Sequence, residues 1–208
     1  MTVYHAAENY ELPQVDLLTL LFDSPDCRSA EDTVVHIEAA NPSNGITKSQ
    51  ARDLTRKTAY GLRHRFGIGA SGPGKDVVVC ISSGQPLLPI VFYGVIAAGG
   101  VYSAASSAFT ASELVRQVTQ GRSNLIFCSP DVKDVAMQAA RDCGIALNRV
   151  VVVDSDPWSM KVIDGGQEIM SEEMLEWERV TNQKELEESL VLLLYSSGTT
   201  GPPKGKGS

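Results

Sequence analysis

Short apolar runs and stretches with helical spacing take turns along most of this sequence, from about residue 46 onward. A helix opens at Thr47, and Gln50 three residues later completes the pattern of a capping box. Val-rich runs such as DVVVCIS at 76–82 are typical of buried parallel strands, because both faces of such strands are covered. The predicted order is a helix from Thr47 to Gly67, a strand at 76–82, a helix at 85–100, a strand at 101–106, a helix from Thr110 to Gly121, a strand at 124–129, a helix at 130–144, and strands at 148–155 and 189–197. This alternation predicts an α/β fold of three layers, with a mostly parallel sheet and helices on both faces.

The first 45 residues are patterned more weakly. VDLLTLLF at 15–22 predicts a short helix, TVVHIEAA at 33–40 predicts a strand, and the cluster from Asn41 to Gly45 predicts a turn. We therefore expect residues 1–45 to be an extension that packs on the domain, and residues 46–208 to form one α/β unit.

Composition and charge narrow the function classes. The 208 residues carry 25 acids and 18 Lys or Arg, a net charge of −7, which argues against a nucleic-acid binder. No apolar run is long enough to span a membrane, and no secretory signal is visible at the start, so a cytoplasmic location is expected.

The stretch 164–188 holds nine acids and two bases and so accounts for the whole net charge. It predicts a solvated face of one or two short helices, with Ser171 as a candidate N-cap; the alternative is a docking surface for a basic partner.

The cysteines, the histidines and the glycine motifs do not predict a metal, redox, dinucleotide or hydrolase site. Cys27, Cys80, Cys128 and Cys143 form no C-x-x-C pair, and Cys80 and Cys128 lie in apolar runs, which indicates buried free thiols in a reducing compartment. The three histidines have no neighbours at metal-ligand spacing. A G-x-G-x-x-G match at 67–72 follows a helix and precedes a strand, the reverse of a dinucleotide fingerprint, so it predicts a loop. No G-x-S-x-G elbow supports a hydrolase.

The informative segment is YSSGTTGPPKG at 195–205, directly after the last apolar strand. It offers hydroxyls, glycines and a lysine within eleven residues. Small residues let a loop wrap an anion closely, successive backbone N–H groups form an anion nest, and Lys204 adds a positive charge. This chemistry suits a polyphosphate, although the segment is not a Walker A loop.

This segment resembles the phosphate-binding loop of the adenylate-forming enzymes, which include acyl- and aryl-CoA ligases, luciferases and peptide-synthetase adenylation domains. The upstream text from 92 to 130 is similar to 4-coumarate- and phenylacetate-type CoA ligases, in particular fungal ones. The likeness runs from about residue 46 to 205. It implies the N-terminal subdomain of the adenylate-forming fold, with 46–208 as a partial AMP-binding domain.

The resemblance implies that a full-length relative uses ATP and Mg to turn a carboxylic acid into an acyl adenylate and then a CoA thioester. In such relatives the acyl pocket and the catalytic lysine lie downstream of this loop, so we expect a truncated ligase-like protein that is inactive alone. We expect this chain to bind the phosphates of ATP at most weakly, and we assign it no catalytic or metal-binding residue. The alternative function is that of a non-catalytic interaction or regulatory protein. The alternative location is the peroxisome, which is known among full-length relatives. The phosphate contacts that the resemblance implies fall on Ser196, Ser197, Gly198, Thr199, Thr200, Gly201 and Lys204.

Overall fold

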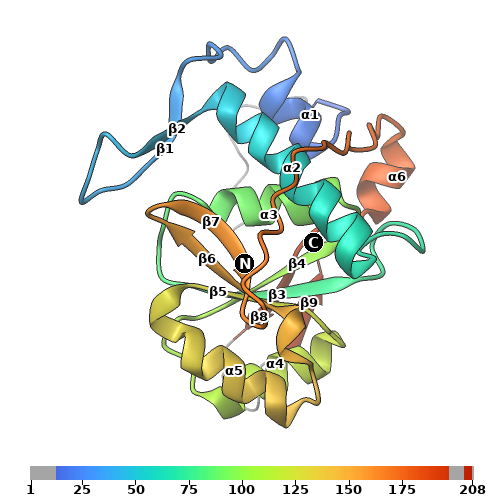
Figure 1. Cartoon of the computed structure of the whole chain (residues 1–208). Coiled ribbons are helices and arrows are strands. Elements are labelled where there is room, and N and C mark those ends of the chain that lie inside the picture. The colour runs from blue at the N-terminus through green and yellow to red at the C-terminus, as the bar shows by residue number, and fades with distance from the viewer. Residues whose placement is uncertain (1–12, 197–203, 208) are drawn as a thin grey trace, which may run out of the picture.

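An open, mostly parallel sheet lies between two layers of helices, which confirms the predicted fold class (Figure 1). The computed structural model describes residues 13–196 and 204–207. Its strands are β1 (Val34–Ile37), β2 (Gly45–Thr47), β3 (Val77–Ile81), β4 (Val101–Ala105), β5 (Ile126–Cys128), β6 (Val150–Ser155), β7 (Trp158–Val162), β8 (Leu193–Ser196) and β9 (Lys204–Gly207). Its α-helices are α1 (Leu17–Phe22), α2 (Lys48–Phe66), α3 (Leu88–Ala97), α4 (Ala111–Gly121), α5 (Lys133–Asp142) and α6 (Gln183–Glu188).

The main sheet has the strand order β4-β3-β5-β6-β7. The first four strands are parallel, and β7 pairs antiparallel with β6, with Val151 opposite Val162. Helix α3 connects β3 to β4 on the face that α2 covers, whereas α4 and α5 cover the other face. The connections that leave β3 and β5 therefore go to opposite faces, which makes the carboxyl ends of these two strands a topological switch point.

Alternating side chains of β3 supply both cores. Val78 and Cys80 pack toward α2 and α3, and Val79 and Ile81 pack toward α4 and α5. Cys80 and Cys128 are free and buried, as predicted. Burial raises the pKa of each of these thiols to about 12, so both are neutral near pH 7.

The predicted capping boxes both form. The Thr47 hydroxyl accepts from the Gln50 amide N–H, and the Gln50 side chain accepts from the Thr47 N–H. Thr110 and Glu113 make the same pair of bonds at α4. Gly67 ends α2 in the left-handed conformation, and the glycine-rich segment 67–72 is the loop between α2 and β3. The expectation of a loop there is confirmed.

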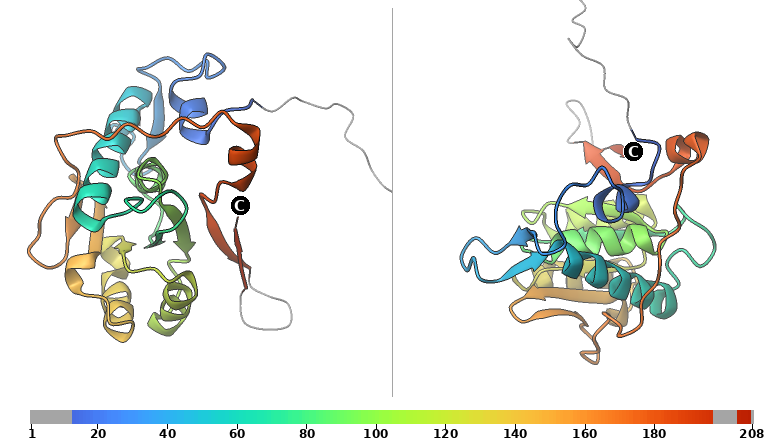
Figure 2. Two further views of the ribbon diagram at one scale, coloured as in Figure 1. Left: turned by 90° about the vertical axis from the view of Figure 1, so that its right-hand side faces the viewer. Right: turned by 90° about the horizontal axis from the view of Figure 1, so that it is seen from above.

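The acidic stretch contains one short helix, α6, as predicted, but the N-cap was assigned wrongly. Ser171 is not an N-cap: its hydroxyl accepts from the Glu173 N–H within a non-helical segment. Residues 169–182, here called the strap, run without helix or strand across the α2 side of the domain (Figure 2). They connect the β7 edge of the main sheet to α6 and β8.

Strap backbone groups bind to α2 and to the N-terminus of α1. The Leu175 N–H donates to the Arg56 carbonyl at 3.1 Å, although that carbonyl lies inside α2. At the far end, Asp16 and Val180 exchange two bonds, one of them through the Asp16 carboxylate. Because these partners are more than 100 residues away in sequence, the strap does not need helical hydrogen bonds of its own.

The N-terminal region joins the same core. Leu18 and Phe22 of α1 are buried in the cluster that contains α2 and α3. The strand predicted at 33–40 is β1, which forms a two-stranded hairpin with β2. The boundary between residues 45 and 46 stays a prediction. None of the helices in the described part of the chain is both long and apolar enough to cross a membrane.

Candidate phosphate-binding site

Strand β8 lies beside β4, at the opposite edge of the main sheet from β7. The Tyr102 N–H donates to the Val191 carbonyl at 2.9 Å, and Tyr102 and Leu192 form a parallel bridge. Because β8 runs parallel to β4, it ends at the same sheet edge as the carboxyl ends of β3, β5 and β6. This is the edge where open α/β sheets bind their ligands.

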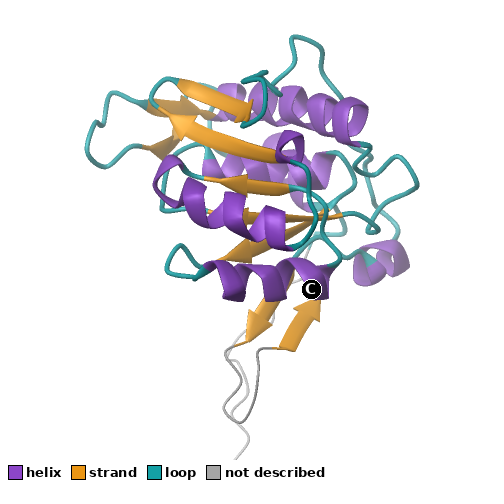
Figure 3. Ribbon diagram, turned by 60° about the horizontal axis from the view of Figure 1, so that its bottom comes forward, coloured by secondary structure: helices purple, strands orange, loops and turns teal. Residues whose placement is uncertain are grey.

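β8 continues into a hairpin with β9 (Figure 3). The two strands pair antiparallel, with Ser196 opposite Lys204 and Tyr195 opposite Gly205. Of the predicted phosphate-binding residues, Ser196 and Lys204 are therefore brought together as a cross-strand pair of backbone positions. Ser197, Gly198, Thr199, Thr200 and Gly201 lie outside the described residues, so their assignment stays a prediction.

Tyr195 fixes the base of this hairpin to α4. Its phenol donates to the Gln117 carbonyl at 3.5 Å. The phenol oxygen also packs closely against Gly121, since a Cβ added to this glycine would lie 3.3 Å from it. Partial burial raises the pKa of Tyr195, so the phenol keeps its proton at neutral pH. Gln117 is itself buried and donates through Nε2 to the Ser103 hydroxyl and the Ala104 carbonyl, both at 2.9 Å. The contacts thus join α4, β4 and the start of the candidate loop.

We expect Gln117→Leu to lower the free energy of unfolding by about 2 kcal/mol, because it leaves the buried Ser103 hydroxyl and the Ala104 carbonyl without this donor. The same change should increase amide hydrogen exchange at Tyr195 more than in β5. Urea denaturation and exchange mass spectrometry measure the two effects. An equal rise in exchange in β5 and β8 would mean that Gln117 does not support β8 in particular.

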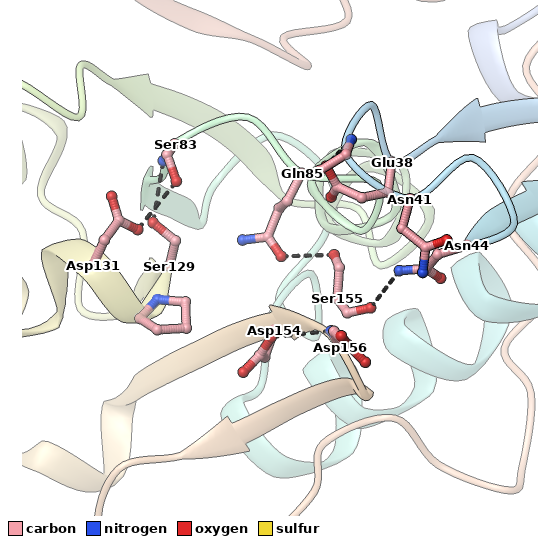
Figure 4. A pocket seen from close by; sticks show the side chains of 12 residues that line it. Glu38, Asn41, Asn44, Ser83, Gln85, Ser129, Asp131, Asp154, Ser155 and Asp156 are labelled. Carbon is pink, nitrogen blue, oxygen red and sulfur yellow. Dashed lines mark hydrogen bonds between the residues drawn. The ribbon is translucent and has the colours of Figure 1, made fainter.

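Polar side chains gather where β3, β5 and β6 end (Figure 4). The sequence alone did not predict a site at these residues. The Ser83 N–H donates to the Ser129 hydroxyl, and the Ser83 hydroxyl donates to Asp131. The Ser155 hydroxyl donates to Gln85 Oε1 at 2.8 Å. A signal for this cluster exists in the sequence, since each of these residues follows or ends an apolar strand.

Metal binding finds no support in the side chains of residues 13–195. These residues contain no cluster of three His, Cys, Asp or Glu side chains that could hold a metal ion. His36 is half-buried, its ring centroid lies 5.9 Å from that of Tyr93, and burial lowers its pKa. His64 stacks on Tyr60 at 4.1 Å, and neither histidine faces a ligand set.

Together, the fold and the hairpin define an α/β protein with a Gly-, Ser- and Thr-rich segment at the carboxyl edge of its sheet. The family model of the AMP-binding enzymes matches residues 26–206, so the chain belongs to this family. A protein of Emericella nidulans named "Putative acyl-coenzyme A synthetase" is 50% identical over 205 residues, which cover 97% of this chain and 37% of that protein. Phenylacetyl-CoA ligase epaB of Aspergillus niger is 28% identical, with 93% of this chain and 35% of that protein covered. The chain thus spans about a third of the length of these curated relatives.

Solved structures confirm the fold. ATP-bound MatB from Rhodopseudomonas palustris superposes with a TM-score of 0.64 at 22% identity, covering 94% of this chain and 35% of that one. The amide bond synthetase McbA from Marinactinospora thermotolerans superposes with a TM-score of 0.61 at 18% identity, covering 84% and 32%. At these identities the likeness concerns architecture alone.

Proposed function

We propose that this chain is the N-terminal, phosphate-binding portion of an acyl-CoA ligase and that it holds the phosphates of ATP through residues 196–204. The observation that carries the proposal is the position of the Ser196–Lys204 pair, at the carboxyl edge of the sheet and at the two ends of the Gly- and Thr-rich segment. The match to the AMP-binding family supports it.

The chemistry of the segment fits an ATP polyphosphate. Backbone N–H groups of Gly198 and Gly201 and the hydroxyls of Ser and Thr are donors, and Lys204 carries the positive charge. Bound ATP supplies an activated α-phosphorus and a pyrophosphate leaving group. The residues of this chain bind and orient the β- and γ-phosphates and offset their charge. The acid, the CoA and the mobile catalytic lysine of the family belong to the full-length protein in this proposal, so the chain alone forms no acyl adenylate.

Lys204→Ala is expected to weaken binding of ATP with Mg²⁺ by about 10- to 100-fold. A hydrogen bond from a charged donor contributes about 1.5–3 kcal/mol, which corresponds to this range. Isothermal titration calorimetry of the wild type and the variant measures the change.

Lys206→Ala is the matched control, because it removes the same charge two residues further along β9 and outside the motif. Equal affinity of all three proteins for ATP would contradict the proposed role of the loop. A pyrophosphate-exchange assay on this chain with a panel of aromatic and aliphatic acids tests the second part. Exchange above background would show that the chain is catalytically complete.

The alternative function, a non-catalytic interaction protein, rests in part on the acidic stretch 164–188 as a docking surface. Of the nine acids at 164–188, Glu172 and Glu176 pair with Lys57 and Arg56 of α2 at 3.3 and 2.9 Å. The Glu168 carboxylate accepts from three backbone N–H groups. Three of the nine acids therefore have partners within the chain, so the acidic stretch is a smaller candidate for a basic partner than its sequence suggests. We also propose a cytoplasmic location, which the four free thiols support.

A further inference from the structure

Strand β1 exposes aliphatic side chains along its whole length. Val34, Val35 and Ile37 are 52%, 40% and 54% exposed, and they are three of the six large exposed hydrophobic residues in the described part of the chain. β1 pairs only with β2 among these residues, and the hairpin projects beyond the α/β body (Figure 1). Its outer edge therefore carries unpaired backbone groups beside an apolar surface, a combination that favours pairing with another strand.

An irregularity in the β1–β2 register gathers the aliphatic groups on one face. The register shifts between Val34 and His36, so that residues three apart can lie on the same side. A Cβ added to Gly45 would lie 2.8 Å from Val34 Cγ1 and 3.9 Å from Ile37 Cγ1, so both side chains lie over this glycine. His36 points instead to Tyr93 of the body. The result is an apolar face formed by Val34 and Ile37.

An acidic pocket of about 600 Å³ begins where β1 ends. Its four carboxylates come from the segment after β1 and from the switch-point edge of the main sheet, and no Lys or Arg lines it (Figure 4). None of these carboxylates forms an ion pair within the described residues. They belong to Glu38, Asp131, Asp154 and Asp156.

The pocket is built from side chains that hold one another in position. Asn44 of the hairpin turn donates to the Ser155 carbonyl and accepts from Trp158 Nε1. Gln85 donates to the Val153 carbonyl at 3.1 Å. Hydrogen bonds from Ser129 and Ser83 keep the pKa of Asp131 below its usual value, so this carboxylate is charged at neutral pH. The hairpin and the pocket are thus fixed to each other.

We propose that β1 and this pocket together dock an extended segment of a basic partner protein, in which a Lys or Arg precedes alternating aliphatic residues. The aliphatic part would pair antiparallel with the outer edge of β1 and cover Val34 and Ile37. Antiparallel pairing puts the N-terminal end of the segment beside Glu38, so its basic side chain enters the pocket. This site is separate from the phosphate loop, and the proposal does not depend on ATP binding.

Charge favours a basic partner over a second copy of this chain. Antiparallel self-pairing centred on Val35 would place Asp32 of each copy opposite Glu38 of the other, and like charges in such pairs are destabilising. The net charge of −7 adds to this repulsion. A segment with Lys or Arg instead neutralises the pocket.

The test uses a synthetic peptide of two arginines followed by three Val-Thr repeats, and a second peptide with two glutamates in place of the arginines. Fluorescence anisotropy against the whole chain should show at least about tenfold tighter binding of the arginine peptide. Asp131→Asn with Asp154→Asn should weaken that binding about tenfold, and 0.5 M salt should do the same, because exposed ion pairs are screened. Ile37→Thr should weaken binding of both peptides.

Glu178→Gln is the matched control, since this exposed carboxylate lies in the acidic stretch and far from β1 in sequence. Thermal denaturation checks that every variant is folded. Equal binding of the two peptides, or no binding of either, would overturn the proposal. So would a loss on Glu178→Gln as large as that on the pocket variant, or a dimer in sedimentation that Ile37→Thr abolishes.

Discussion

Gly61→Ala is expected to lower the free energy of unfolding by about 3 kcal/mol, although alanine is the better helix former. Gly61 lies inside α2 and directly beneath the strap, where a Cβ would overlap the carbonyl oxygen of Ile169. An alanine in a helix normally gains about 1 kcal/mol over glycine. Here the strap backbone must move to admit the methyl group, and overpacking against rigid backbone exceeds that gain. Urea denaturation measures the change.

Gly84→Ala provides the control, because a Cβ at Gly84 meets nothing within 4 Å. It should change the free energy of unfolding by less than about 0.5 kcal/mol. If Gly61→Ala were instead as stable as the wild type, the strap would not rest on α2 as the structure shows.

Trp177→Ala is expected to cost about 4 kcal/mol, a large effect for a residue of the strap. The indole is 6% exposed, donates through Nε1 to the Thr19 hydroxyl at 3.0 Å, and lies 5.0 Å from the Arg56 guanidinium carbon. Its ring also lies 5.9 Å from that of Phe22. Truncation removes contacts with both α1 and α2 and leaves a cavity between them.

Trp177→Phe separates packing from hydrogen bonding. It keeps most of the buried ring and loses the bond to Thr19, so a cost of about 1–2 kcal/mol is expected in the same denaturation experiment. Losses of equal size in the two variants would show that the hydrogen bond, rather than the buried ring, is what holds the strap.

The strap connects the packing around Gly61 and Trp177 to the proposed phosphate-binding site. It leads from β7 at one edge of the sheet to α6 and then to β8 at the other edge, so its path determines where β8 joins β4. Variants that release the strap should therefore also disturb Tyr195 and β8, at the base of the proposed phosphate loop.

Local signals in the sequence were enough to predict much of the fold. The capping boxes at Thr47 and Thr110 and the Val-rich run of β3 form the predicted elements, since each depends on residues within one turn or one strand. Ser171 in the strap was wrongly predicted as an N-cap, because the hydrogen bonds of this segment reach α2 and α1 across more than 100 residues. β7 was missed for a related reason: it folds back on β6, and only the pairing reveals it.

For the candidate site, too, local sequence signals led to some residues and not to others. The residues at 196–204 were predicted from composition and resemblance, because anion-binding loops use glycine, hydroxyl and lysine groups that are close in sequence, and their role stays a prediction. The residues that support the loop were not found, because Gln117 and Tyr102 come from other elements and meet β8 only in the folded chain. The pocket beside β1 was missed because its four carboxylates come from three separate segments, after β1, after β5 and at the end of β6.

We propose above that residues 196–204 bind the phosphates of ATP. An NMR titration of the isotope-labelled chain with ATP and Mg²⁺ tests it most directly, since each backbone amide reports its own surroundings. We expect saturable shifts in the backbone amides of residues 196–201 and 204, with smaller shifts at Tyr102 and Gln117, and their loss in Lys204→Ala. Saturable shifts confined to the pocket at Ser83 and Asp131, or no saturable shift at 196–204, would contradict it.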